Sequence, residues 1–141
     1  MNDPLALLAV IAVTALAAAW WRALDGKAHV RADEIGLEPL RAAGAPTGAW
    51  LLLELTAPHC AACLRARRVL DEVVQRSPDV AVHAVDIADA GDIAHSQRVL
   101  RAPTVLLVDP GGVVRARVAG VPSASDLTRM LEQRGSLPMA S

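Results

Sequence analysis

The chain has 141 residues, enough for one domain of ordinary size plus an appendage. Its net charge of −1 gives no electrostatic case for nucleic acid, and its three aromatic residues, all tryptophan, exclude base-stacking platforms. Hydrophobic residues make up 53 % of the chain, which is high for a fully soluble domain, so we expect a membrane segment.

An uncharged apolar run from Pro4 to Trp21 accounts for this excess. As a helix at about 1.5 Å per residue it would span roughly 27 Å, just enough for a bilayer core. Trp20 and Trp21 would then lie at the membrane interface, where amphipathic rings are favoured. A buried core helix does not fit, because residues 5–19 have no polar face. The sequence predicts a single-pass anchor within residues 1–22 that contacts the membrane through residues 4–21.

The charges around this run favour one orientation. Arg22 and Lys27 follow it, and no basic residue precedes it. The positive-inside rule therefore places the remaining chain on the cytoplasmic side of the cell membrane. Ala15-Leu16-Ala17 resembles a signal-peptidase site, so a cleaved signal and an extracytoplasmic domain stay open as the alternative.

The rest of the chain predicts an α/β domain. Residues 23–48 are polar and glycine-rich, which indicates a juxtamembrane linker with one weak strand or helical turn near 34–43. We then expect strands at 50–55, 80–87, 104–108 and 113–118, and helices at 60–76, 88–100 and 124–133, the last capped by Ser123. This order predicts a central mixed β-sheet flanked by helices on both faces, in a domain spanning 49–135 and followed by a flexible tail at 136–141.

The only two cysteines, Cys60 and Cys63, stand where an apolar strand ends and a helical pattern begins. The first turn of a helix has unpaired N–H groups and a partial positive charge, and both stabilise a thiolate. Cysteines three residues apart on a helix also lie close enough to form a disulfide. The pair can therefore serve as a two-electron redox couple.

Other uses of these cysteines are weaker. A fixed disulfide would close only a two-residue loop and add little stability. A metal site could use His59 beside the two cysteines, but a closed zinc site needs four ligands and the chain has no second cysteine pair. Covalent haem needs a histidine directly after the second cysteine, and Leu64 stands there. We expect redox use, with no metal and no cofactor.

The chain resembles the thioredoxin family over roughly residues 49–134. The resemblance rests on Leu53-Glu54-Leu55-Thr56-Ala57-Pro58-His59-Cys60-Ala61-Ala62-Cys63, followed by Leu70-Asp71-Glu72, Val85-Asp86, Ala102-Pro103-Thr104 and Val118-Ala119-Gly120. It implies a thioredoxin-like fold, which in this chain would follow the predicted transmembrane helix. Within the family, the chain most resembles short membrane-tethered members from high-GC bacteria.

The resemblance also implies roles for individual residues. Cys60 matches the nucleophile that attacks a partner disulfide, and Cys63 matches the thiol that resolves the mixed disulfide. Pro103 matches a cis-proline facing the cysteines, and Ala102 and Thr104 flank it in the segment that binds substrate. A proline that merely starts a strand is the alternative for Pro103.

Two further residues are candidates near the cysteines. Glu54 lies in an otherwise apolar strand, where desolvation favours its protonated form, and the family places an acid there that shuttles the proton of the resolving cysteine. Its alternative is an edge position facing water. A cationic His59 would stabilise the Cys60 thiolate; its alternative is exposure without effect. Arg65, Arg67 and Arg68 are most simply a solvated helix face.

These features predict a membrane-tethered thiol–disulfide oxidoreductase, an enzyme that reduces protein disulfides through Cys60 and Cys63. Its partners would be disulfide-containing client proteins and an electron donor, such as a thioredoxin reductase or another dithiol protein. Two alternatives remain: a thioredoxin scaffold that binds partners or holds metal without turnover, and an extracytoplasmic thioredoxin-like protein of cytochrome maturation.

Overall fold

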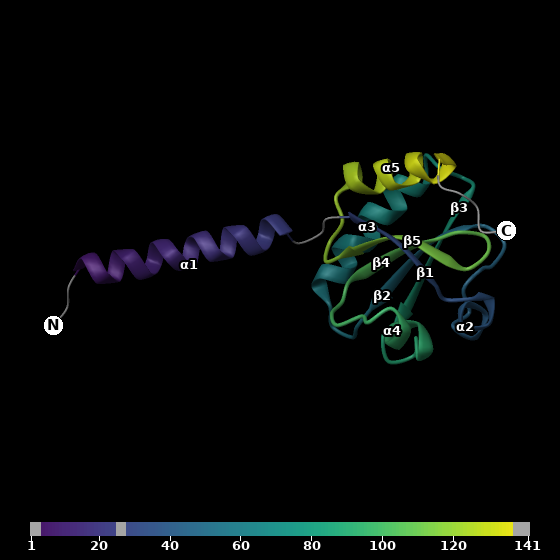
Figure 1. The fold of residues 1–141 in the computed structure, drawn as a ribbon, viewed down its shortest axis with the longest axis horizontal. Coiled ribbons are helices and arrows are strands. Elements are labelled where there is room, and N and C mark those ends of the chain that lie inside the picture. Colours follow the sequence, from purple (N-terminus) through teal and green to yellow (C-terminus); the bar gives the residue numbers. More distant parts are fainter. Residues whose placement is uncertain (1–3, 25–27, 137–141) are drawn as a thin grey trace.

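A computed structural model describes residues 4–24 and 28–136 of the chain, with no account of the side chains of residues 24–32. Its elements in chain order are α1 (Pro4–Leu24), β1 (Ala28–Glu34), α2 (Leu37–Ala42), β2 (Trp50–Thr56), α3 (Ala61–Val74), β3 (Val80–Asp86), α4 (Asp92–Ser96), β4 (Thr104–Val108), β5 (Val113–Ala119), α5 (Ala124–Gln133) and a 3-10 turn at Arg134–Ser136 (Figure 1).

The five strands of the described residues form one mixed sheet in the order β1-β5-β4-β2-β3. β2 and β3 run parallel, whereas the other three neighbouring pairs are antiparallel. β2 therefore lies inside the sheet between β3 and β4, and both of its faces are covered. This position explains why its sequence is nearly continuous in apolar residues.

Helices cover the two faces of the sheet: in Figure 1, α5 lies above the strands, and α2 and α4 lie below them. Leu51, Leu53 and Leu55 of β2 face α2 and α4, through Leu40 and Ile93. Residues of the opposite parity face α3 and α5, whose buried members include Leu70, Val73, Leu127, Met130 and Leu131. The two-residue period of a strand thus places Glu54 on the same face as Leu52, beneath α3. The predicted α/β fold with a mixed sheet between helices is confirmed.

α1 contains a span, Pro4–Ala23, that is long and apolar enough to cross a membrane, and none of it is buried. A helix of this kind near an N-terminus is found both in membrane anchors and in signal sequences.

Several elements differ from their expected bounds. Within 23–48, expected as a linker with one weak strand or helical turn near 34–43, α2 lies where the helical turn is expected and buries Leu40 in the core. β1, which pairs with β5, is not expected there. The predicted helix at 88–100 is only Asp92–Ser96, because Gly91 (φ 46°) and Arg98 (φ 49°) have left-handed backbone that a helix cannot contain. Of the expected tail, Ser136 belongs to the 3-10 turn, and 137–141 lie outside the described residues.

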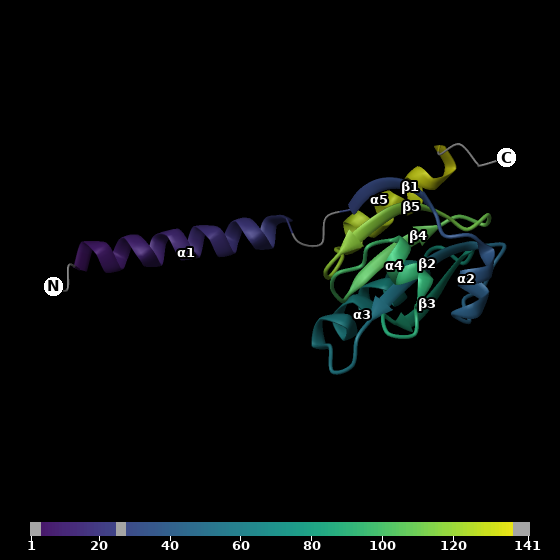
Figure 2. The ribbon, with the colours of Figure 1, turned by 60° about the horizontal axis from the view of Figure 1, so that its bottom comes forward.

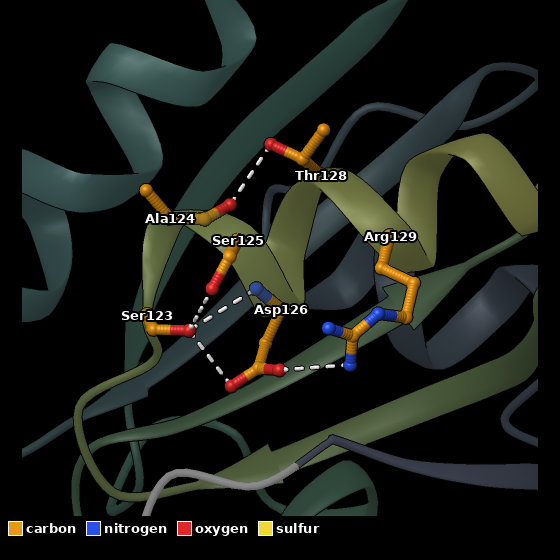
Figure 3. A network of polar contacts seen from close by, with 6 residues as sticks. All are labelled: Ser123, Ala124, Ser125, Asp126, Thr128 and Arg129. Carbon is orange, nitrogen blue, oxygen red and sulfur yellow. Dashed lines mark hydrogen bonds and ion pairs between the residues drawn. The ribbon is translucent and has the colours of Figure 1, made fainter.

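The start of α5 is capped as expected. Ser123 Oγ accepts a hydrogen bond from the backbone N–H of Asp126 at 3.1 Å and donates one to its carboxylate at 2.7 Å (Figure 3). Arg129 pairs with the same carboxylate at 3.3 Å. These contacts satisfy one of the first-turn N–H groups and place a negative charge near the positive end of the helix.

Candidate active site

The cysteine pair lies where β2 leads into α3. β2 ends at Thr56, and Cys60 is the N-cap of α3, with extended backbone (φ −91°, ψ 95°). His59, just before it, has a φ of 57°, a left-handed conformation that turns the chain into the helix. Cys60 and Cys63 are joined by a disulfide, with their Cα atoms 5.2 Å apart. Both sulfurs are therefore held at the carboxyl end of a central strand and at the amino end of a helix.

The two cysteines differ in exposure. Cys63 is buried, with 6 % of its surface exposed, whereas Cys60 is only half-buried. Cys60 Sγ also accepts a hydrogen bond from the backbone N–H of Cys63 at 3.1 Å. A helix-terminal N–H directed at sulfur stabilises negative charge on it. Of the two, Cys60 is therefore both the more reachable sulfur and the one whose thiolate is stabilised by this contact.

An open cleft of about 600 Å³ adjoins the disulfide. Its lining comes from the end of β2, the loop after it, the first two turns of α3 and one residue of β3: Glu54, Thr56, Ala57, His59, Cys60, Ala61, Cys63, Leu64, Arg67 and Ala84. The structure thus brings four predicted site residues together in this cleft, namely the two cysteines, Glu54 and His59.

Glu54 is the buried acid of the cleft, with 1 % of its surface exposed. Its Oε2 atom lies 3.5 Å from Arg67 Nη1, and its Oε1 atom is buried without a hydrogen-bond partner among the described residues. Burial, through desolvation of the charged form, raises the pKa of Glu54 above its ordinary value. The Arg67 charge opposes this effect and the Asp71 charge reinforces it. The expected desolvation is present, and the alternative of an edge position facing water does not apply, since Glu54 pairs on both sides of β2.

Arg67 is the residue of this cleft that the sequence interpretation misplaces. The pattern assigns it to a solvated helix face, but it bridges Glu54 at 3.5 Å and Asp71 at 3.8 Å, with 40 % of its side chain exposed. The available signal is spacing, because Arg67 follows Cys63 by four residues and so shares its helix face. Ala84, the β3 residue in register with Glu54, carries no charge. The positive charge beside Glu54 therefore comes from Arg67 on α3.

The segment Ala102-Pro103-Thr104 lies at the neighbouring strand end and does not line this cleft. The Ala102–Pro103 peptide bond is cis, as the resemblance implied. Thr104 is in register with Leu55 of β2, and the Pro103 carbonyl accepts a hydrogen bond from the Gly120 N–H at 2.8 Å. The segment is therefore fixed at the same end of the sheet as the cysteines, one strand away.

The described residues offer little for the metal-holding alternative. Within residues 4–24 and 28–136, no group of three histidine, cysteine or acidic side chains is arranged to hold a metal ion. His59 is exposed beside the disulfide, and the two cysteine sulfurs are bonded to each other.

The fold and the site together define a class: an α/β domain whose paired cysteines form a redox-active centre at the start of a helix, as in thiol–disulfide oxidoreductases. The family model described as Thioredoxin matches residues 46–133, which is more than half of the chain. The chain belongs to the thioredoxin family.

Solved structures agree at the level of the fold. A chloroplastic thioredoxin z is 21 % identical, with a TM-score of 0.57, and the match covers 77 % of this chain and 98 % of that one. Mitochondrial thioredoxin 3 from Saccharomyces cerevisiae, in its oxidised form, is 23 % identical, with a TM-score of 0.53 and coverage of 61 % and 79 %. Fasciola hepatica thioredoxin is 20 % identical, with a TM-score of 0.52 and coverage of 62 % and 82 %. Comparison with curated protein sequences gives no match.

Proposed function

We propose that this protein is a membrane-tethered oxidoreductase that reduces disulfides of client proteins, with Cys60 as the nucleophile and Cys63 as the resolving thiol. The observation that carries the proposal is the inequality of the two sulfurs. Cys60 is accessible and its Sγ accepts the Cys63 N–H, whereas Cys63 is buried behind it. An attacking sulfur must be ionised and reachable, and a resolving sulfur needs to reach only its neighbour.

The reaction transfers two electrons and two protons to the client. The Cys60 thiolate attacks one sulfur of the client disulfide, and the other client sulfur leaves as a thiolate that takes a proton. Cys63 then loses its proton and attacks Cys60 Sγ. This step forms the Cys60–Cys63 disulfide and releases the second client sulfur, which is protonated in turn. A dithiol donor, such as a thioredoxin reductase or another dithiol protein, would restore the reduced pair.

Glu54 is proposed as the proton acceptor for Cys63 in the second step. The two side chains line the same cleft. Burial raises the pKa of Glu54 and so brings it closer to the working pH, where a carboxyl group exchanges protons most efficiently. The opposing charge of Arg67 keeps the anionic form accessible after proton release. Both protonation states are needed in one turnover, and burial together with Arg67 supports both.

The substrate is proposed to bind across the same end of the sheet. His59, exposed before Cys60, would contact the client beside the nucleophile. Ala102 would pair with the client's extended backbone, and Pro103 and Thr104 would contact the client next to that pairing. Their common position at the carboxyl end of β2 and the start of β4 supports this assignment.

The tether is proposed to be α1, with the domain on the cytoplasmic side of the cell membrane. The apolar span Pro4–Ala23 and the basic residues Arg22 and Lys27 after it support this topology. A C-terminal reporter that is active on only one side of the membrane tests it. Activity on the outer side would contradict the cytoplasmic placement and favour the extracytoplasmic alternative.

The chemistry is tested on the full-length chain in detergent with insulin as the disulfide substrate and dithiothreitol as the reductant. Wild type should reduce insulin faster than dithiothreitol alone, and both Cys60→Ser and Cys63→Ser should abolish this gain. The pair of variants also separates the two roles. Cys63→Ser should trap a covalent complex with a disulfide client, visible on a non-reducing gel, whereas Cys60→Ser should trap none. Turnover by Cys60→Ser, or trapping by that variant instead, would contradict the assignment.

A further inference from the structure

We propose that the redox site faces the membrane that anchors the chain, so that its partner is an integral membrane protein whose cysteines lie at the bilayer surface. The inference rests on the proposed function and on the proposed tether. The experiments are chosen so that failure of the orientation, of the tether and of the oxidoreductase activity give different results.

The first step of the argument is the shortness of the connection. α1 ends at Leu24 and β1 begins at Ala28, so only three residues lie between them. Four Cα–Cα steps of about 3.8 Å limit the distance between Leu24 and Ala28 to roughly 15 Å. Trp20 and Trp21, near the end of α1, favour the membrane interface. The first residue of the sheet is therefore held close to the bilayer surface.

The second step is which end of the sheet that residue occupies. Ala28 is in register with Val118 of β5, Val118 with Val105 of β4, and Val105 with Glu54 of β2. The start of β1 thus lies level with the end of β2, where the chain turns to Cys60. Three strand spacings of about 4.8 Å put only roughly 14 Å across the sheet between Ala28 and Glu54. Figure 2 shows β1 and α3 beginning at the same end of the domain.

The third step concerns the surface at this end. Outside α1, the large apolar side chains described as exposed are Leu64, at 67 %, and Leu100, at 91 %. Leu64 lines the cleft one residue after Cys63. Leu100 precedes Thr104, the first residue of β4, by four positions, and Thr104 is in register with Leu55 at the end of β2. These two leucines are the apolar side chains at this end that a bound partner would cover.

The geometry is tested without any redox chemistry. In a Cys60→Ser, Cys63→Ser background of the full chain, a single cysteine at position 64 (Leu64→Cys) or 75 (Gln75→Cys) carries a donor fluorophore, and the vesicles carry headgroup-labelled acceptor lipid. Position 64 lies in the first turn of α3 and position 75 is the C-cap at its other end, about 16 Å away along the helix axis. Energy transfer should be stronger from position 64. Insertion of twenty Gly/Ser residues after Gly26 should reduce the difference, because such a linker spreads over roughly 25 Å.

Equal transfer from both positions, or stronger transfer from position 75, would overturn the proposed orientation. Loss of transfer from both positions would show that α1 does not hold the chain in the bilayer, which overturns the tether together with the orientation. Thermal unfolding of both labelled variants, monitored by circular dichroism, checks that they retain the fold.

The partner class is tested with the native cysteines in place. The probe is a synthetic transmembrane helix that carries a Cys-Gly-Gly-Cys disulfide directly after its interfacial tryptophan, and its control has a twenty-residue helical spacer before the disulfide. In shared vesicles, the reduced full chain should reduce the surface disulfide about tenfold faster than the distant one, because short tethers raise effective concentration. The Gly26 insertion should remove this preference.

The rate of insulin reduction distinguishes failure of the membrane-facing partner from failure of the oxidoreductase activity. Wild type and the insertion variant should reduce it at equal rates. Equal rates on the surface and distant probes, with insulin reduced normally, would overturn the membrane-facing partner and leave the oxidoreductase standing. Failure to reduce insulin as well would overturn the proposed function, and the partner inference with it.

Discussion

Replacing Glu54 with leucine should make the protein more stable and less active. Glu54 is 1 % exposed, and its Oε1 atom is buried without a partner among residues 4–24 and 28–136. A buried polar atom left without a hydrogen bond costs about 1–3 kcal/mol. The substitution also removes the ion pair with Arg67, which is 3.5 Å long and 40 % exposed on the arginine side. Solvent screening limits such a pair to less than about 1 kcal/mol.

The balance predicts that Glu54→Leu raises the free energy of unfolding by about 1–2 kcal/mol at neutral pH. For a domain of this size, each kcal/mol corresponds to roughly 4–8 °C in Tm. Urea unfolding of the oxidised full chain in detergent measures the change, and Glu72→Leu, on the exposed face of α3, should stay within about 0.5 kcal/mol of wild type. Insulin reduction by Glu54→Leu should fall by about 100-fold, because Cys63 would lose its proposed proton acceptor.

Two results would refute this reasoning separately. A Glu54→Leu protein that is less stable than wild type would show that the carboxyl group has a stabilising partner inside the domain. A stabilised variant with unchanged insulin reduction would show that Glu54 does not take the Cys63 proton.

Burial raises the pKa of Glu54 from its ordinary value of 4.5, so between the unfolded and folded pKa values the native state keeps a proton that the unfolded chain has lost. Stability should therefore fall as the pH rises through that window, and urea midpoints across pH should show no such fall from this site in Glu54→Gln. Arg67→Met should raise the pKa of Glu54 further, because the guanidinium lowers it, and should move the pH profile of insulin reduction to higher pH; carboxyl NMR measures the shift, and Arg68→Met should leave it unchanged. Ser123→Ala should lower the free energy of urea unfolding by about 1 kcal/mol through loss of the α5 cap, and an equal loss in Ser125→Ala would contradict this assignment.

The sequence predicted the parts of the fold that depend on local pattern. The apolar run at 50–55 and the capping serine at 123 each lead to the element expected of them. The position of the cysteine pair, between a strand end and a helix start, could be predicted because an apolar strand pattern precedes it and a helical pattern follows it. Glu54 was recognisable as buried because its strand neighbours are leucines and a buried strand alternates between two covered faces.

Other parts depended on contacts distant in sequence. β1 is stabilised as a strand by its ladder with β5, about 80 residues away in sequence. Its own residues, Ala28–Glu34, are too polar to predict a strand. The shortened α4 reflects backbone at Gly91 and Arg98 that composition does not reveal. Arg67 looked like one of three surface arginines, and only its placement over Glu54 distinguishes it from Arg65 and Arg68.

The pairing of β1 with β5 has a consequence for the fate of the chain after proteolysis. A cut inside α1, for example after Ala17, would remove apolar residues that contribute nothing to the core and would leave the five strands described between residues 28 and 136 in place. The shed fragment would keep its edge strand and its cysteine pair, so a single cut would convert the proposed membrane-tethered oxidoreductase into a diffusing one without unfolding it. Release would change where the sulfurs can act while leaving their chemistry intact.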